Sequence, residues 1–119
     1  MKANYTLAHR ALTADTHVIA VGGELDMSAA PDLRATIDSV LDDGAVTLVV
    51  DLTEATFIDS TGIGTLMSAL HRLKESGGTL ELVCVEPNLL RVFEIVGLDR
   101  QLSIHATTES ALSSFAGAR

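Results

Sequence analysis

The residues best suited to chemistry lie in a polar block at positions 59–64, Asp-Ser-Thr-Gly-Ile-Gly. An apolar pair ends there and a helical apolar period begins, so Asp59, Ser60 or Thr61 is the predicted N-cap of a helix. The free N–H groups and the positive dipole end of such a helix favour an anion such as phosphate, and the two glycines leave its approach open. A plain cap by Ser60 fits the same spacing, so both interpretations stay open.

Enzyme chemistry at this serine lacks its usual partners. A serine hydrolase elbow needs Gly-x-Ser-x-Gly, but Ser60 has Ile58 two positions before it. His71 lies eleven residues beyond Ser60, a rise of about 16 Å along a helix, so it cannot be the base of that serine. The other histidines lie on separate predicted strands without the spacing of metal ligands: His9, His17 and His105. We therefore expect no enzyme activity and no metal site.

Nucleotide and receiver-type phosphate chemistry are also poorly supported. The glycine pair Gly62 and Gly64 is followed by Met67 where a dinucleotide loop needs glycine, and no Gly-Lys-Ser/Thr occurs. Asp51, at the end of an apolar strand, matches the position of a response-regulator acceptor. However, no acidic pair follows the first strand and no lysine follows the last, so the magnesium-binding part of such a site is missing. No cofactor is predicted.

Composition limits the partners and the compartment. The 119 residues suffice for one domain, and 47% are hydrophobic, which predicts a folded core. With 8 basic and 16 acidic residues, the net charge of −8 repels nucleic acid and anionic membranes and favours a partner with a basic surface. There is neither an apolar run long enough for a membrane helix nor a secretory signal at the start, and the single Cys84 fits a reducing cytoplasm.

The elements that must position the polar block follow from alternating period-2 and period-3.6 stretches, which predict an α/β fold. Two strands form an antiparallel hairpin, the second ending at Gly22-Gly23, and β-α-β units with parallel strands and right-handed crossovers follow. Met27 and Met67 are expected in the core, and Cys84 is expected to be a core or sheet-face thiol. The prediction is a mixed sheet of five strands, 5–9, 17–21, 45–50, 80–85 and 102–105, and four helices, from Ser28 or Ala30 to Gly44, from the polar block to Gly77, 87–97 and 108–116, with 51–59 irregular.

On these residues the chain resembles the anti-sigma factor antagonists of the STAS-domain superfamily. The likeness covers residues 3–117 as a single STAS domain and rests most of all on the Asp-Ser-Thr-Gly-Ile-Gly block. The other matching motifs are Gly23-Glu24-Leu25-Asp26, Leu33, Val49-Val50-Asp51-Leu52, Phe57-Ile58 and Gly97-Leu98.

The resemblance implies a regulatory binding protein that works by partner switching in a transcriptional stress response. In such proteins the serine after the aspartate, here Ser60, is phosphorylated by a partner that is both a serine kinase and an anti-sigma factor. The unphosphorylated form binds that partner and frees the sigma factor, and a serine phosphatase resets the cycle. Thr61, whose hydroxyl is adjacent, is the competing acceptor.

A partner-facing surface follows from the same positions. Asp26 lies on the loop after the second strand and should share one end of the sheet with Ser60 if both follow parallel strands. The residues expected to line this surface are Asp26, Asp59, Ser60, Thr61, Gly62 and Gly64. Phosphorylation would add a charge of about −1.5 to −2 there.

Two other functions remain open. The domain could be a non-phosphorylated STAS adaptor in a lipid or anion transporter or in a scaffold complex, although the intact block at 59–62 argues against it. Nucleotide binding is the third possibility, but the chain has neither a phosphate loop nor a base for it.

Overall fold

A mixed sheet of six strands forms the centre of the computed structural model, which describes residues 4–116. The strands are β1 (Tyr5–Ala11), β2 (Thr16–Leu25), β3 (Thr47–Asp51), β4 (Ala55–Ile58), β5 (Thr79–Val83) and β6 (Ser103–His105). The described helices are α1 (Ala30–Asp42), α2 (Ser60–Glu75), α3 (Pro87–Val96) and α4 (Thr108–Ala116), with a short 3-10 turn, η1 (Leu98–Arg100).

The strand order confirms the predicted fold class. The sheet runs β1-β2-β3-β5-β6, with β1 and β2 antiparallel and the β2–β3, β3–β5 and β5–β6 pairs parallel. The hairpin is therefore followed by parallel β-α-β units, as the alternation of periods predicts. The domain limits expected at 3 and 117 lie outside the described residues.

The segment predicted to be irregular, 51–59, contains a strand that the sequence analysis missed. Strand β4 pairs in parallel with the end of β2, where Leu25 is the register partner of Ile58. This partner is available because β3 pairs with β2 only as far as Ala20, which leaves the last part of β2 without a neighbour on that side. The sequence analysis missed this strand because four residues show a period of two only weakly. The described sheet therefore has six strands rather than the predicted five.

The end of β2 also differs from the prediction, whereas the start of α1 agrees with it. Strand β2 continues through Gly22 and Gly23 to Leu25 instead of ending at the glycines. Gly23 adopts φ +78°, and the register between β2 and β4 shifts between it and the following residue. Glycine tolerates this conformation, so the pair makes an irregularity within the strand rather than its end. Helix α1 begins at Ala30, one of the two predicted starts.

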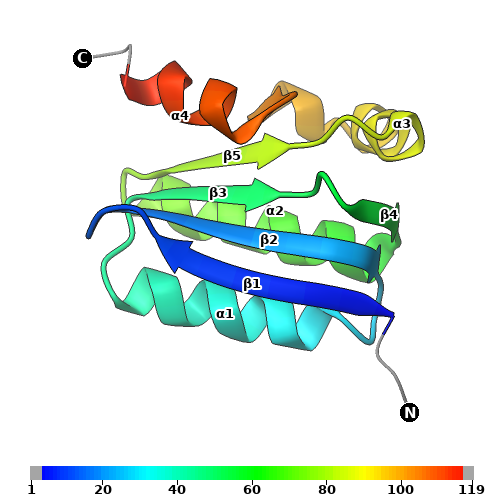
Figure 1. The fold of residues 1–119 in the computed structure, drawn as a ribbon, viewed down its shortest axis with the longest axis horizontal. Helices are drawn as coiled ribbons and strands as arrows, with labels where there is room; N and C mark the ends of the chain where they lie inside the picture. The colour runs from blue at the N-terminus through cyan, green and yellow to red at the C-terminus, as the bar shows by residue number, and fades with distance from the viewer. Residues whose placement is uncertain (1–3, 117–119) are drawn as a thin grey trace.

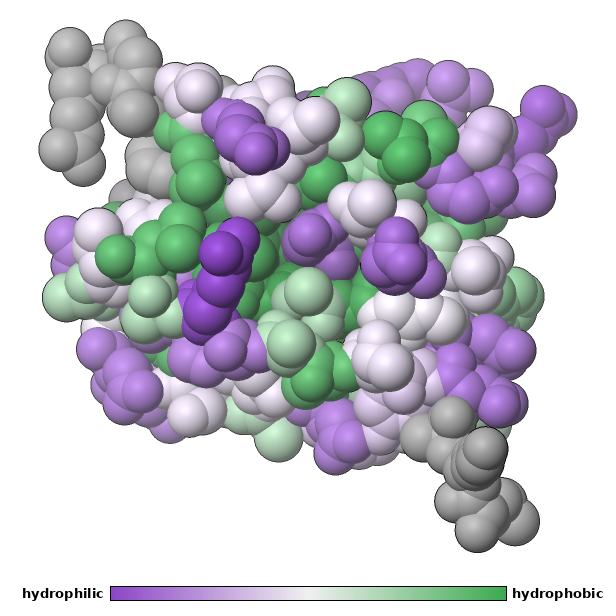
Figure 2. All heavy atoms as spheres, viewed as in Figure 1, coloured by the Kyte–Doolittle hydropathy of each residue, from purple (hydrophilic) through white to green (hydrophobic). Residues whose placement is uncertain are grey.

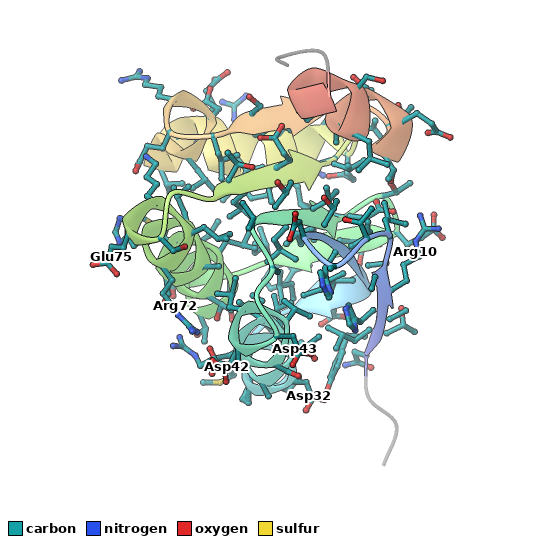
Figure 3. All side chains as sticks on the ribbon, turned by 90° about the vertical axis from the view of Figure 1, so that its left-hand side faces the viewer. Arg10, Asp32, Asp42, Asp43, Arg72 and Glu75 are labelled. Atoms are coloured by element: carbon teal, nitrogen blue, oxygen red, sulfur yellow. The ribbon has the colours of Figure 1, made fainter. Side chains whose placement is uncertain are left out.

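Helices cover the two faces of the sheet unequally. Helices α1 and α2 lie side by side on one face (Figures 1 and 3), and the main core there includes Ile19, Leu66 and Phe93, each 0% exposed. On the other face, α4 packs Ala111 against a smaller cluster that includes Val49. Figure 2 shows this second face, on which hydrophobic and hydrophilic residues are interspersed rather than gathered into one broad apolar patch.

A charged contact joins α1 and α2 on the solvent side. Arg72 of α2 donates a hydrogen bond to Asp38 of α1, and its other terminal nitrogen lies 3.9 Å from a carboxylate oxygen of Asp42. Figure 3 shows Arg72 reaching toward Asp42, while Arg10 on β1 points away from both helices. Such exposed pairs contribute about 0–1 kcal/mol, so the helices are held mainly by their apolar faces. Among residues 4–116, no helix combines the length and apolar character needed to span a bilayer.

The buried side of α2 predicts a large difference between two leucine truncations. Leu66→Ala should lower the free energy of unfolding by about 2–5 kcal/mol, because it leaves a cavity at a side chain that is 0% exposed. Leu12→Ala, at a side chain that is 39% exposed, is the matched control and should change stability by less than about 1 kcal/mol. Urea unfolding measures both, and equal effects would contradict the assignment of this core.

Candidate functional site

Helix α2 begins with a carboxylate cap. Asp59 has extended backbone angles, φ −112° and ψ −174°, and its Oδ1 accepts hydrogen bonds from the backbone N–H groups of Thr61 at 2.9 Å and Gly62 at 3.0 Å. Its carbonyl oxygen accepts the first intrahelical bond, from Ile63 N–H, at 3.0 Å. Of the three N-cap candidates in the sequence, Asp59 is therefore the one that caps.

The cap changes the expectation of an anion site at this helix end. The Asp59 carboxylate already accepts hydrogen bonds from two backbone N–H groups of the first turn and is itself a negative charge there. A free phosphate would have to displace that side chain or approach it against repulsion. The predicted open cradle for an anion is therefore wrong, because the chain supplies its own anion.

Ser60 is left free by the same arrangement. It is the first residue of α2 and is exposed, and its hydroxyl makes no side-chain hydrogen bond among the described residues. Thr61 is exposed too, one position further along the helix. Both hydroxyls are therefore accessible to a modifying enzyme.

The two glycines of the block have different positions. Gly64 is exposed, and a Cβ added to it would meet nothing within 4 Å. Gly62 is buried, and a Cβ there would lie 2.5 Å from the carbonyl oxygen of Leu25 and 2.8 Å from Cγ1 of Ile58. The expectation that Gly62 lines the exposed surface is therefore wrong: it lets α2 approach β2 and β4 closely.

Asp26 and Asp59 lie at one edge of the sheet, as expected. They directly follow Leu25 and Ile58, which are register partners in the parallel β2–β4 pair, and Asp59 N–H donates to the Leu25 carbonyl at 3.2 Å. Asp26 accepts hydrogen bonds from the Ser28 hydroxyl at 2.7 Å and the Ser28 N–H at 3.0 Å. The hydroxyl bond is the largest cause lowering the pKa of Asp26, which favours a carboxylate at this edge.

Exposed apolar side chains flank the two aspartates, and the sequence analysis missed them. Met27, expected in the core, is 71% exposed on the loop after Asp26, so that expectation is wrong. Phe57 of β4 is 48% exposed. Neither side chain belongs to a long periodic element, so the only available signal was an apolar residue beside a polar turn. Together with the acids and hydroxyls they form a mixed apolar and acidic surface.

Helix α3 extends this end of the molecule. It contacts β4, and Figure 1 shows both at the end of the sheet where the parallel strands finish. Two of its apolar residues are also exposed, Ile95 at 73% and Val96 at 44%. We define the α2 N-terminal surface as the exposed or half-buried residues Asp26, Met27, Phe57, Asp59, Ser60, Thr61 and Gly64.

The remaining candidates take structural positions. Asp51 accepts hydrogen bonds from the Thr53 hydroxyl and N–H and so closes a turn. Cys84 is 3% exposed, as expected of a core thiol, and burial raises its pKa. His9 and His17, on separate strands, come together with Nε2 and Nδ1 at 2.8 Å. Within residues 4–116, no cluster of three or more His, Cys, Asp or Glu side chains is arranged to hold a metal ion.

Comparisons with known proteins agree on one family. The family model for the STAS domain matches residues 10–111. The "Anti-sigma-B factor antagonist" of Bacillus subtilis (strain 168) is 33% identical over 92 residues, which cover 77% of this chain and 84% of that protein. The anti-sigma factor antagonist SpoIIAA in its unphosphorylated form superposes with a TM-score of 0.83 at 27% identity, covering 94% of this chain and 97% of that one. The Bacillus SpoIIAA in its phosphorylated form gives 0.75 at 28% identity, covering 92% and 99%.

The division of roles between Asp59 and Ser60 is testable by stability alone. Asp59→Ala should destabilise the domain by about 1 kcal/mol, since it removes the acceptor of two helix N–H groups. Ser60→Ala is the matched control and should leave the free energy of unfolding within about 0.5 kcal/mol of the wild-type value. Thermal or urea unfolding reports both. A larger loss for the serine variant would mean that the hydroxyl, not the carboxylate, caps α2.

Proposed function

We propose that this chain, which belongs to the STAS domain family and is an anti-sigma factor antagonist, is switched by phosphorylation of Ser60. The unphosphorylated form binds an anti-sigma factor that is also a serine kinase, and so releases the sigma factor. Phosphorylation at Ser60 ends that binding, and a serine phosphatase restores it. The chain acts by binding and itself catalyses no step of this cycle.

One observation carries the proposal: Ser60 is exposed, and its hydroxyl makes no side-chain hydrogen bond among the described residues, beside a carboxylate that already caps the helix. A kinase can reach this oxygen without opening the fold, because no described side-chain contact has to break. The solved forms of SpoIIAA, one unphosphorylated and one phosphorylated, support the same kind of modification in a similar protein.

The phosphate would change the surface rather than the fold. It adds a charge of about −1.5 to −2 at the first residue of α2, where the helix dipole favours negative charge. However, Asp59 and Asp26 already hold negative charge at this edge, so the group would extend toward solvent. The expected result is a folded domain with a strongly acidic contact site.

The size of this charge is sufficient for a switch. Two like charges about 4 Å apart repel by roughly 4 kcal/mol at an effective dielectric constant of about 20. About 1.4 kcal/mol changes an affinity tenfold, so half of that repulsion already separates a bound from an unbound state. Burying the phosphate beside Met27 and Phe57 adds a desolvation cost, because these side chains offer it no hydrogen bond.

The charge of the switch predicts opposite results for two serine variants. Ser60→Ala should bind the cognate kinase like the wild type and escape control, whereas Ser60→Asp should bind at least about tenfold more weakly. Ser39→Asp, at an exposed position on α1, adds the same charge away from the α2 N-terminal surface and should bind normally. Isothermal titration calorimetry measures these affinities. Wild-type binding by Ser60→Asp would refute the electrostatic switch.

Phosphopeptide mapping after incubation with the kinase identifies the acceptor. We expect phosphate on Ser60, with Thr61 as the competing hydroxyl, and Ser60→Ala should abolish incorporation. A partner bound through the same surface without any phosphorylation would instead favour the adaptor function in a transporter or scaffold complex.

The apolar side chains of the α2 N-terminal surface should contribute to the affinity for the partner. Met27→Ala and Phe57→Ala should each weaken partner binding by about 1–2 kcal/mol, because exposed large side chains at an interface centre act as anchors. Val46→Ala, at a side chain that is 47% exposed just before β3, is the control and should have no effect. The same calorimetric titration applies, with unfolding curves to show that stability is unchanged. Equal affinities for all three variants would place the interface elsewhere.

A further inference from the structure

Three polar side chains contact one another between the sheet and α4, far along the sequence from the α2 N-terminal surface. Glu81 of β5 contacts His105 of β6, with Oε1 and Nε2 2.6 Å apart. The other ring nitrogen, Nδ1, lies 3.4 Å from the Ser110 hydroxyl of α4. Glu81 is 8% exposed, while Ser110 is exposed. The three residues therefore form a carboxylate–imidazole–hydroxyl relay that runs from a buried acid to the surface.

The protonation of the relay follows from its donors and acceptors. An ionised carboxylate can only accept, so Nε2 of His105 carries the hydrogen that lies between it and Glu81. In the neutral ring Nδ1 is then unprotonated and can accept the proton of the Ser110 hydroxyl. A base held in one tautomer by an acid and placed against a hydroxyl is the arrangement that activates a serine nucleophile. The 3.4 Å separation is long, as is common for such pairs without substrate.

The position of Ser110 adds to this effect. It is the third residue of α4, and its own N–H donates to the Thr107 hydroxyl at 3.0 Å. The first turn of a helix is the positive end of the dipole, which stabilises negative charge that develops on a nearby oxygen. On these grounds we propose that Ser110 is a nucleophilic serine that accepts acyl groups from activated esters, with His105 as its base and Glu81 as the residue that orients the base.

In the proposed reaction an acyl group moves from the oxygen of the ester to the oxygen of Ser110. The Ser110 oxygen forms a bond to the carbonyl carbon of the ester, and its proton moves to Nδ1 of His105. The bond from that carbon to the leaving oxygen then breaks, and the leaving group departs with the electron pair. The proton on His105 is returned to the leaving group or to water. Acyl-Ser110 is the product, and no oxidant, metal or cofactor takes part.

Carboxylates beside the proposed nucleophile limit which esters fit. Glu81 contacts the base, and Glu109 directly precedes Ser110 in the first turn of α4. These negative charges disfavour anionic substrates, so small neutral or cationic esters are the expected class.

The full chain incubated with p-nitrophenyl acetate tests the relay. We expect a burst of p-nitrophenolate and one acetyl group on Ser110, located by mass spectrometry of peptides. Ser110→Ala should lose the adduct, and His105→Gln should slow its formation about 100-fold, the scale of general base catalysis. Ser113→Ala, an exposed serine one turn further on α4, is the matched control and should react like the wild type.

The outcomes separate the relay from incidental reactivity. Acetylation found only on lysines or the amino terminus, or an equal rate for Ser110→Ala and Ser113→Ala, would overturn the proposal. An unchanged rate for His105→Gln would also overturn it, since the serine would then react without its base. Circular dichroism confirms that each variant folds. Ser110→Ala keeps the test valid if the His105 variant does not fold, because Ser110 is exposed.

Discussion

The close approach of α2 to the β2–β4 pair is the constraint on which the α2 N-terminal surface depends. Gly62 lies so near the Leu25 carbonyl that a Cβ would come within 2.5 Å of it, and this closeness sets where the helix can begin. The Asp59 carboxylate then accepts hydrogen bonds from two N–H groups of the first helical turn, those of Thr61 and Gly62. Because Asp59 and Gly62 make the contacts that fix the start of α2, the Ser60 hydroxyl has no hydrogen-bonding role among the described residues.

Parallel pairing gives this edge of the sheet its chemical character. Register partners Leu25 and Ile58 are followed by Asp26 and Asp59, so two carboxylates lie together where the strands end. Met27 adds an apolar side chain to the same edge. A surface that combines apolar area with negative charge suits a neutral or basic partner.

On the opposite face of the sheet, α4 covers a buried carboxylate. Helix α4 covers a small apolar cluster and also closes over Glu81, a carboxylate that would be costly to bury alone. His105 satisfies that carboxylate, and Ser110 in turn contacts the ring at the surface. Among the described residues no buried side-chain nitrogen or oxygen lacks a hydrogen-bond partner. The contact with His105 provides that partner for Glu81.

Much of the fold was predictable because it rests on local periodicity. The apolar spacing of Leu33, Ile37 and Val40 predicted a buried helix face, and those side chains are buried. Cys84, between two valines of a predicted strand, was expected to be a core or sheet-face thiol and is buried. The polar block at 59–64 was recognisable as a helix start from residue types alone, and its likeness to anti-sigma factor antagonists was sufficient to indicate the family.

What the sequence by itself determined, then, is the α/β fold class, the family, and every strand and helix except β4 and the short turn η1. Only the tertiary structure decided that Asp59 is the cap, that Gly62 is buried and that Met27 is exposed. It also decided that β4 joins β2, and that Glu81 meets His105 and Ser110. These outcomes depend on contacts between segments far apart in the chain, and four-residue strands or single side chains show no periodicity that would reveal such contacts.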